Sequence, residues 1–114
     1  MKKIILILAF TNIAFTQNIK STNTVEQVLD NLHLYAAEAN AKKYIDLFAD
    51  GAVFFGTDIS ERWPKVEFSK YATDRMSSGT GWTYFMKERN IYFSNDHKTA
   101  WFDEILTNKG YGEF

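Results

Sequence analysis

The stretch YIDLFADGAVFFGTDISERW, residues 44–63, carries the strongest fold signal in the sequence. Its first part reads as a short helix, with Tyr44, Leu47 and Phe48 on one face and a stop at Asp50 and Gly51. The apolar run AVFFG, residues 52–56, then predicts a strand. A helix that ends in Asp-Gly and leads directly into a strand indicates a domain of mixed α and β structure.

The rest of the chain extends this pattern. Apolar residues recur at helical spacing over residues 25–39, and Pro64 is well placed as the first residue of a third helix. Strands are expected over 82–94 and 99–108, separated by the turn NDHK. Because helices and strands do not alternate regularly, the sequence predicts an α+β domain, with helices on one face of a mostly antiparallel sheet.

Composition narrows the classes of function. The chain has 114 residues, a formal net charge of −1 and no cysteine, and 17% of its residues are aromatic. The near-neutral charge argues against a nucleic-acid partner. The absence of cysteine removes disulfides and thiol chemistry. This much ring surface suits a thick core or the wall of a pocket.

Residues 1–16 have the layout of a secretory signal. Lys2 and Lys3 precede a short apolar run, and the small residues Ala14 and Thr16 come just before Gln17. We therefore expect an exported protein, periplasmic or extracellular, whose domain covers residues 17–114 and has no membrane contact after cleavage. An uncleaved N-terminal anchor is the alternative.

The motifs YIDLFADGAVFFGTDISERW, EFSKY, GWTY, AWFDE and YGEF, in this order, resemble the SnoaL-like branch of the nuclear transport factor 2-like superfamily. The resemblance implies a cone-shaped, cystatin-like roll, in which helices pack within a curved antiparallel sheet around a small-molecule pocket. Family members close the sheet with two further strands. The chain ends at Phe114, where the first of these would begin, so we expect the domain to be incomplete at its C-terminus and to form a homodimer when complete.

The same superfamily includes the ketosteroid isomerases and polyketide cyclases. The region that holds the isomerase's catalytic aspartate reads Phe54, Phe55 and Gly56 in this chain, and the position of its helix-borne tyrosine falls near Leu32. Steroid isomerase chemistry is therefore not implied.

The charged loop after residue 56 is the first candidate site, with Asp58, Glu61 and Arg62 closed by Trp63. Three interpretations are open: a solvated loop, a structural ion pair, or charges that grip a ligand. Because Trp63 and the following helix fold the loop back, we expect its charges to turn inward at the pocket mouth. Arg62 is then expected to be held by an acidic partner, which its planar guanidinium can bind through two parallel hydrogen bonds.

His33 is the best candidate for acid–base chemistry, because the ordinary pKa of histidine lies near neutrality. A structural histidine, bonded to a carboxylate or a carbonyl, is the alternative. Asp103 and Glu104 point to opposite faces of their strand, so only one can face the pocket. Both faces are apolar, and the pattern does not choose between them. We select Asp103 with His33 as the catalytic pair.

The remaining pocket candidates are aromatic or basic residues of the two long strands, namely Trp82, Tyr84, Arg89 and Trp101. No cofactor is expected. Two histidines without cysteine offer no standard metal-ligand spacing, so no metal site is predicted.

These residues favour an exported protein that binds a small, partly apolar organic molecule, with isomerase-, cyclase- or hydratase-like proton transfer as the best-matched chemistry. The alternative is a non-catalytic binding or dimerisation module whose polar cluster is structural. A binding or catalytic pocket would place His33 and a carboxylate on one open cavity. An interaction module would fill that cavity with its own aromatic rings.

Overall fold

The computed structural model describes residues 22–108 and 112–113. The predicted signal segment, residues 1–16, lies outside these described residues. In chain order the elements are a helix over residues 22–37, α2 (Ala41–Asp46), β1 (Val53–Phe55), β2 (Arg62–Pro64), α3 (Lys65–Ser77), β3 (Phe85–Phe93), β4 (Ala100–Asn108) and β5 (Gly112–Glu113). The α+β composition and the antiparallel strand pairing are those expected from the sequence.

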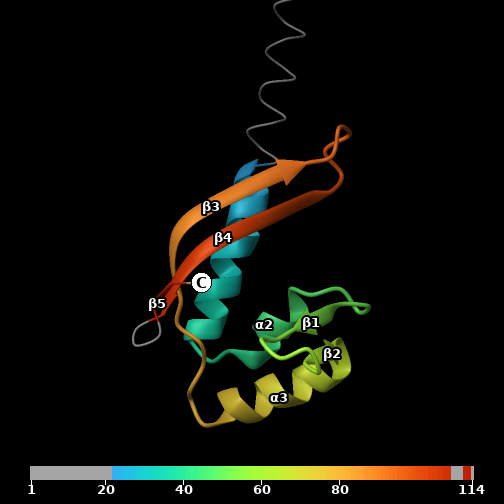
Figure 1. The fold of residues 1–114 in the computed structure, drawn as a ribbon. Helices are drawn as coiled ribbons and strands as arrows, with labels where there is room; N and C mark the ends of the chain where they lie inside the picture. The colour runs from blue at the N-terminus through green and yellow to red at the C-terminus, as the bar shows by residue number, and fades with distance from the viewer. Residues whose placement is uncertain (1–21, 109–111, 114) are drawn as a thin grey trace, which may run out of the picture.

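The helix over residues 22–37, hereafter helix 22–37, runs between two groups of elements. Figure 1 shows the β3–β4 hairpin crossing this helix, while α2, β1, β2 and α3 gather at its C-terminal end. No helix in the described part of the chain is long and apolar enough to cross a membrane.

The β3–β4 hairpin is antiparallel, and its register sets which side chains share a face of the sheet. Phe93 pairs with Ala100 at the turn, and Arg89 pairs with Glu104 four residues further along. Residues directly opposite each other share a face, and neighbouring pairs alternate between faces. The Glu104 carboxylate contacts His33, so Glu104 lies on the face that meets helix 22–37. Tyr92 and Trp101 are an odd number of residues away along their strands and lie together on the other face.

The β1–β2 hairpin replaces part of the expected loop. Arg62–Pro64 forms a strand that pairs with β1, with Phe54 opposite Trp63 and Phe55 opposite Arg62. Pro64 ends this strand and is the N-cap of α3 rather than its first residue. This corrects the sequence expectation of a loop that runs from Gly56 to the helix.

Among the described residues, the buried hydrophobic side chains belong to helix 22–37 and α3. Leu29 and Ala36 of helix 22–37 are buried, as are Ala72 and Met76 of α3. Gly81 lies so close to the Ala36 carbonyl that a Cβ at this position would collide with that oxygen. This close approach lets the next backbone N–H, that of Trp82, donate to the Ala36 carbonyl at 3.0 Å.

Candidate functional site

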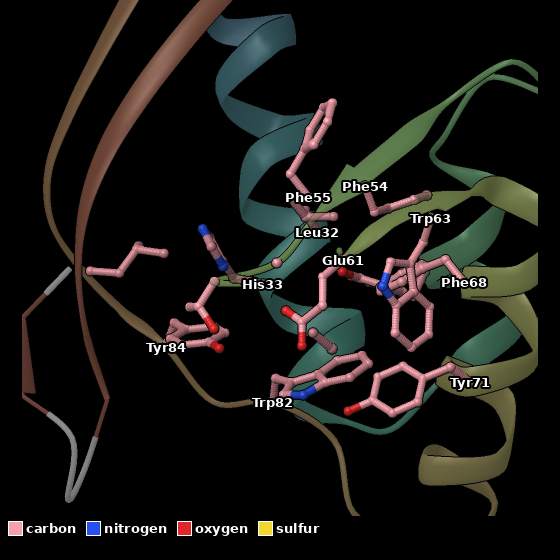
Figure 2. Close-up of a pocket in the computed structure, with 15 residues that line it drawn as sticks. Leu32, His33, Phe54, Phe55, Glu61, Trp63, Phe68, Tyr71, Trp82 and Tyr84 are labelled. Carbon is pink, nitrogen blue, oxygen red and sulfur yellow. The ribbon is translucent and has the colours of Figure 1, made fainter. Parts of the chain in front are cut away.

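A cavity of about 510 Å³ opens where these elements meet. Its walls come from helix 22–37, α2, the β1–β2 hairpin, α3, the segment before β3, and β4. Figure 2 shows side chains from these elements converging on one space, with His33 and Tyr84 on one side and the larger rings on the other.

Aromatic side chains dominate the lining. The aromatic residues that line the cavity are Tyr44, Phe54, Phe55, Trp63, Phe68, Tyr71, Trp82 and Tyr84. Phe68 is central to this group, since its ring stacks on that of Phe54 with a centroid distance of 3.8 Å and an interplanar angle of 13°. Phe68 also stacks on Trp82, with a centroid distance of 6.2 Å. The rings of α3, β1 and the segment before β3 therefore support one another around the open cavity.

The β1–β2 hairpin directs Glu61 into this cavity. Side chains alternate along an extended chain, so Glu61 and Trp63 share a side and both line the cavity. The Gly56 N–H donates to the Glu61 carbonyl at 2.9 Å, which extends the pairing of the hairpin by one step. Gly56 also leaves space for the Glu61 side chain, because a Cβ there would collide with it. Figure 2 shows the Glu61 carboxylate in the space between Tyr84 and Trp82.

The same alternation turns Arg62 outward. Arg62 lies opposite Phe55, which is exposed, and its own side chain is exposed. Within residues 22–108, no carboxylate lies at ion-pair distance from its guanidinium. The expectation that Arg62 is held inward by an acidic partner is wrong, because a hairpin cannot place Glu61, Arg62 and Trp63 on the same side.

Asp58 is also outside the cavity. Its carboxylate accepts hydrogen bonds from the Ser60 backbone N–H at 2.8 Å and the Ser60 hydroxyl at 2.5 Å. Both hydrogen bonds lower the pKa of Asp58 below its ordinary value, and the bond from the hydroxyl has the larger effect. Asp58 thus closes the hairpin turn on the surface, which corrects its expected place in the pocket.

His33 belongs to a chain of polar side chains that joins the cavity to the sheet. Its Nε2 lies 3.1 Å from both carboxylate oxygens of Glu104. Glu104 also accepts from Arg89 Nη2 at 3.3 Å, and Arg89 Nη1 donates to Asp30 at 2.8 Å. The side chains of Glu104 and Arg89 are only 4% and 7% exposed, whereas His33 is 18% exposed and Asp30 63%.

This arrangement decides which of the two adjacent carboxylates faces inward. Asp103 is exposed on the outer face of β4, where it accepts from the Asn90 amide at 3.0 Å. Glu104 meets His33 instead. The choice of Asp103 as the partner of His33 is therefore corrected to Glu104.

The Glu104 contact orients the His33 ring. An ionised carboxylate only accepts hydrogen bonds, and Glu104 also accepts from Arg89. His33 Nε2 is therefore the donor to Glu104, and Nδ1 takes no part in that contact. The partner that orients the ring lies outside the cavity lining.

Tyr44 supplies a hydroxyl that stays protonated. Burial, and then the nearby Tyr84 hydroxyl, raise the pKa of Tyr44 to about 12. Tyr44 can therefore donate a hydrogen bond in the cavity over the whole neutral range.

Of the residues that the sequence nominated, His33, Glu61, Trp63, Trp82 and Tyr84 line the cavity. Their roles in binding stay a prediction. Arg89 contacts the site only through Glu104, and Trp101 stacks on Tyr92 on the outer face of the sheet, with a centroid distance of 6.2 Å.

Several lining residues were not among the nominated site residues, namely Tyr44, Phe54, Phe68 and Tyr71. Their apolar spacing indicated burial. The same spacing is typical of core residues, so it gave no sign of an open cavity.

A family model described as a SnoaL-like domain, of the nuclear transport factor 2-like superfamily, matches residues 25–114. No curated protein and no solved structure shows a significant match to the chain. The family match confirms the resemblance and the fold class expected from the sequence.

Proposed function

The chain belongs to the SnoaL-like domain family, and from this premise we propose that its cavity binds a small, partly apolar organic molecule and that His33 exchanges a proton with it. One observation carries the proposal: a cavity of about 510 Å³ remains open between aromatic walls and has both His33 and a carboxylate, that of Glu61, on its surface. Sites for small molecules are typically about 300–1,000 Å³, mostly apolar, with few polar groups.

The open cavity favours ligand binding over the alternative of a purely structural module. In that alternative the aromatic side chains would fill the space between helix 22–37 and the β1–β2 hairpin. The rings instead pack against one another, as Phe68 does on Phe54, and leave their cavity-facing edges and faces for a ligand.

The histidine network supports the chemical part of the proposal. Glu104 holds His33 through Nε2, so Nδ1 is the ring nitrogen left to exchange a proton with a bound molecule. A base of this kind, oriented by a carboxylate, can accept a proton from an acidic carbon of a bound molecule and return it. Tyr44 is a protonated donor that can stabilise the oxygen of the resulting enolate.

Proton transfer is tested with the full chain and a neutral carbon acid, 2-tetralone, in D₂O. The protein is expected to accelerate exchange of the α-hydrogens for deuterium, as followed by NMR. We expect His33→Gln to reduce the catalysed rate by roughly 10²-fold or more, the usual contribution of a general base. Gln keeps a donor that can reach Glu104, so the fold around the network is retained.

His97 provides the matched control. It lies exposed in the β3–β4 turn with a φ of 56°, so His97→Asn suits its backbone conformation and should leave the exchange rate unchanged. If 2-tetralone binds and His33→Gln exchanges it as fast as the parent does, the site binds without acid–base chemistry by His33. If neither 2-tetralone nor any other small aromatic ketone binds, the binding proposal itself is wrong.

A further inference from the structure

The charges on the cavity surface are unbalanced. Among its lining residues Glu61 supplies a carboxylate, and the lining includes neither lysine nor arginine. Apart from the tyrosines, His33 is the other lining residue with an ionisable side chain. Its Nε2 already contacts Glu104. The lining therefore has an acceptor with full negative charge and no fixed positive charge.

Glu61 has little to compensate its charge. The hydrogen bond found for its carboxylate is a long one, from the Asp58 N–H at 3.4 Å. No lysine or arginine of residues 22–108 forms an ion pair with it. A carboxylate that is partly removed from water and surrounded by rings gains from a cation brought to it.

The nearby basic side chains are engaged elsewhere. Arg89 is shared between Glu104 and Asp30, so its guanidinium is already paired with carboxylates. Lys65 donates to the Phe48 carbonyl at 2.6 Å. None of these side chains is part of the cavity lining, so none is placed to pair with Glu61 inside it.

The rings beside Glu61 also favour a cation. Figure 2 shows the indole of Trp82 next to the Glu61 carboxylate, with Tyr71 and Trp63 beyond it. Trp82 already accepts a cation on its surface, since the Arg75 guanidinium lies 5.2 Å from the ring centroid, and Arg75 is not part of the cavity lining. Aromatic faces attract organic cations through the ring quadrupole, most strongly where water is excluded.

We infer that the ligand of this cavity is an organic cation, an ammonium group attached to an apolar body, whose charge lies between Glu61 and the Trp82 ring. This inference rests on the proposed binding function and names the chemical class of its ligand. Neutral molecules of the same shape bind less tightly, and anions are repelled by Glu61.

Three probes of matched shape test the inference by calorimetry on the full chain. They are 4-hydroxyphenyltrimethylammonium, 4-tert-butylphenol and 4-hydroxybenzenesulfonate, which have a cationic, a neutral and an anionic tetrahedral head. We expect the cation to bind roughly tenfold more tightly than its neutral isostere, and the sulfonate to bind more weakly than either.

Glu61→Gln preserves the shape of the side chain and removes its charge, so it should bring the cation to within about twofold of 4-tert-butylphenol. Asp58→Asn is the matched control. It removes a carboxylate from the same hairpin, outside the cavity, and should retain the preference for the cation. Gly56→Ala, which displaces the Glu61 side chain without removing charge, should weaken the preference as well.

The outcomes separate the inference from the function on which it rests. Equal affinity for the cationic and neutral probes, unchanged by Glu61→Gln, overturns the inference and leaves the pocket intact. Tighter binding of the sulfonate overturns it too. Failure of all three probes, together with failure of 2-tetralone, counts against the binding function.

Discussion

Replacing Glu104 with leucine is expected to lower the free energy of unfolding by about 3 kcal/mol. Breaking a buried charge pair by removing one partner typically costs about 3–5 kcal/mol, because the other charge is left without compensation. Arg89, only 7% exposed, loses Glu104 but keeps its bond to Asp30, which places the expected loss at the lower end of that range. Urea denaturation of the parent and the variant measures the difference.

Asp103→Leu is the control for this prediction. Asp103 is the neighbouring residue on β4, but it is exposed and bonds the Asn90 amide. Its replacement should change stability by less than about 1 kcal/mol. The double variant Arg89→Leu/Glu104→Leu should recover part of the loss, because no guanidinium is then stranded. Equal losses for Glu104→Leu and Asp103→Leu would show that the network is not an energetic centre of the fold.

Phe68→Ala is expected to remove about 3 kcal/mol of stability. The Phe68 ring stacks on Phe54 and contacts the rings of Tyr44, Trp63 and Trp82 at centroid distances of 6.2–6.4 Å. The substitution therefore removes contacts with α2, both strands of the β1–β2 hairpin and the segment before β3 at once. Thermal or denaturant unfolding measures the loss.

Val66 lies two residues earlier on the same helix, and its side chain is exposed. Val66→Ala should change stability by less than about 0.5 kcal/mol, since it removes little buried surface. A Phe68→Ala variant that is as stable as Val66→Ala would mean that the aromatic cluster is not packed as described.

The sequence predicts the sheet and helices well where periodicity is strong. The strand pattern of residues 99–108 agrees with β4, whereas α2 ends at Asp46, four residues before the predicted stop at Asp50 and Gly51. The strand expected over 82–94 begins three residues too early, since β3 begins at Phe85. Trp82 and Tyr84 are typical strand residues, but here they line the cavity. The family model matches residues 25–114, a range that includes these elements.

The charged hairpin shows where sequence reasoning failed and why. The interpretation of 57–62 as a loop treated its charges as one group that turns inward together. Had Arg62–Pro64 been recognised as a strand, the placement of Trp63 inside would have put Glu61 inside and Arg62 outside, by the two-residue period alone. The structure pairs this strand with β1, Phe54 opposite Trp63, and the assumption of a loop left this pairing out.

The choice between Asp103 and Glu104 needed tertiary information. Apolar residues lie on both faces of β4, so alternation could not decide which face meets the helix. Counting back from the pair Phe93 and Ala100 at the hairpin turn places Arg89 opposite Glu104. That cross-strand ion pair was the available signal for the inward carboxylate.

The central claim is that the aromatic cavity, and not the outer face of the sheet, receives the ligand. The chain has three tryptophans, of which Trp63 and Trp82 line the cavity and Trp101 lies on the outer face of β4. Their indole N–H signals in a ¹⁵N-correlated NMR spectrum, assigned with single Trp→Phe variants, therefore report on the two locations separately.

Titration of the full chain with 4-hydroxyphenyltrimethylammonium, and with 4-tert-butylphenol, is the most direct measurement. The account predicts that the signals of Trp63 and Trp82 shift together and saturate, while the signal of Trp101 stays in place. A shift of Trp101 alone, or an equal and unsaturable drift of all three signals, would contradict the assignment of this cavity as the binding site.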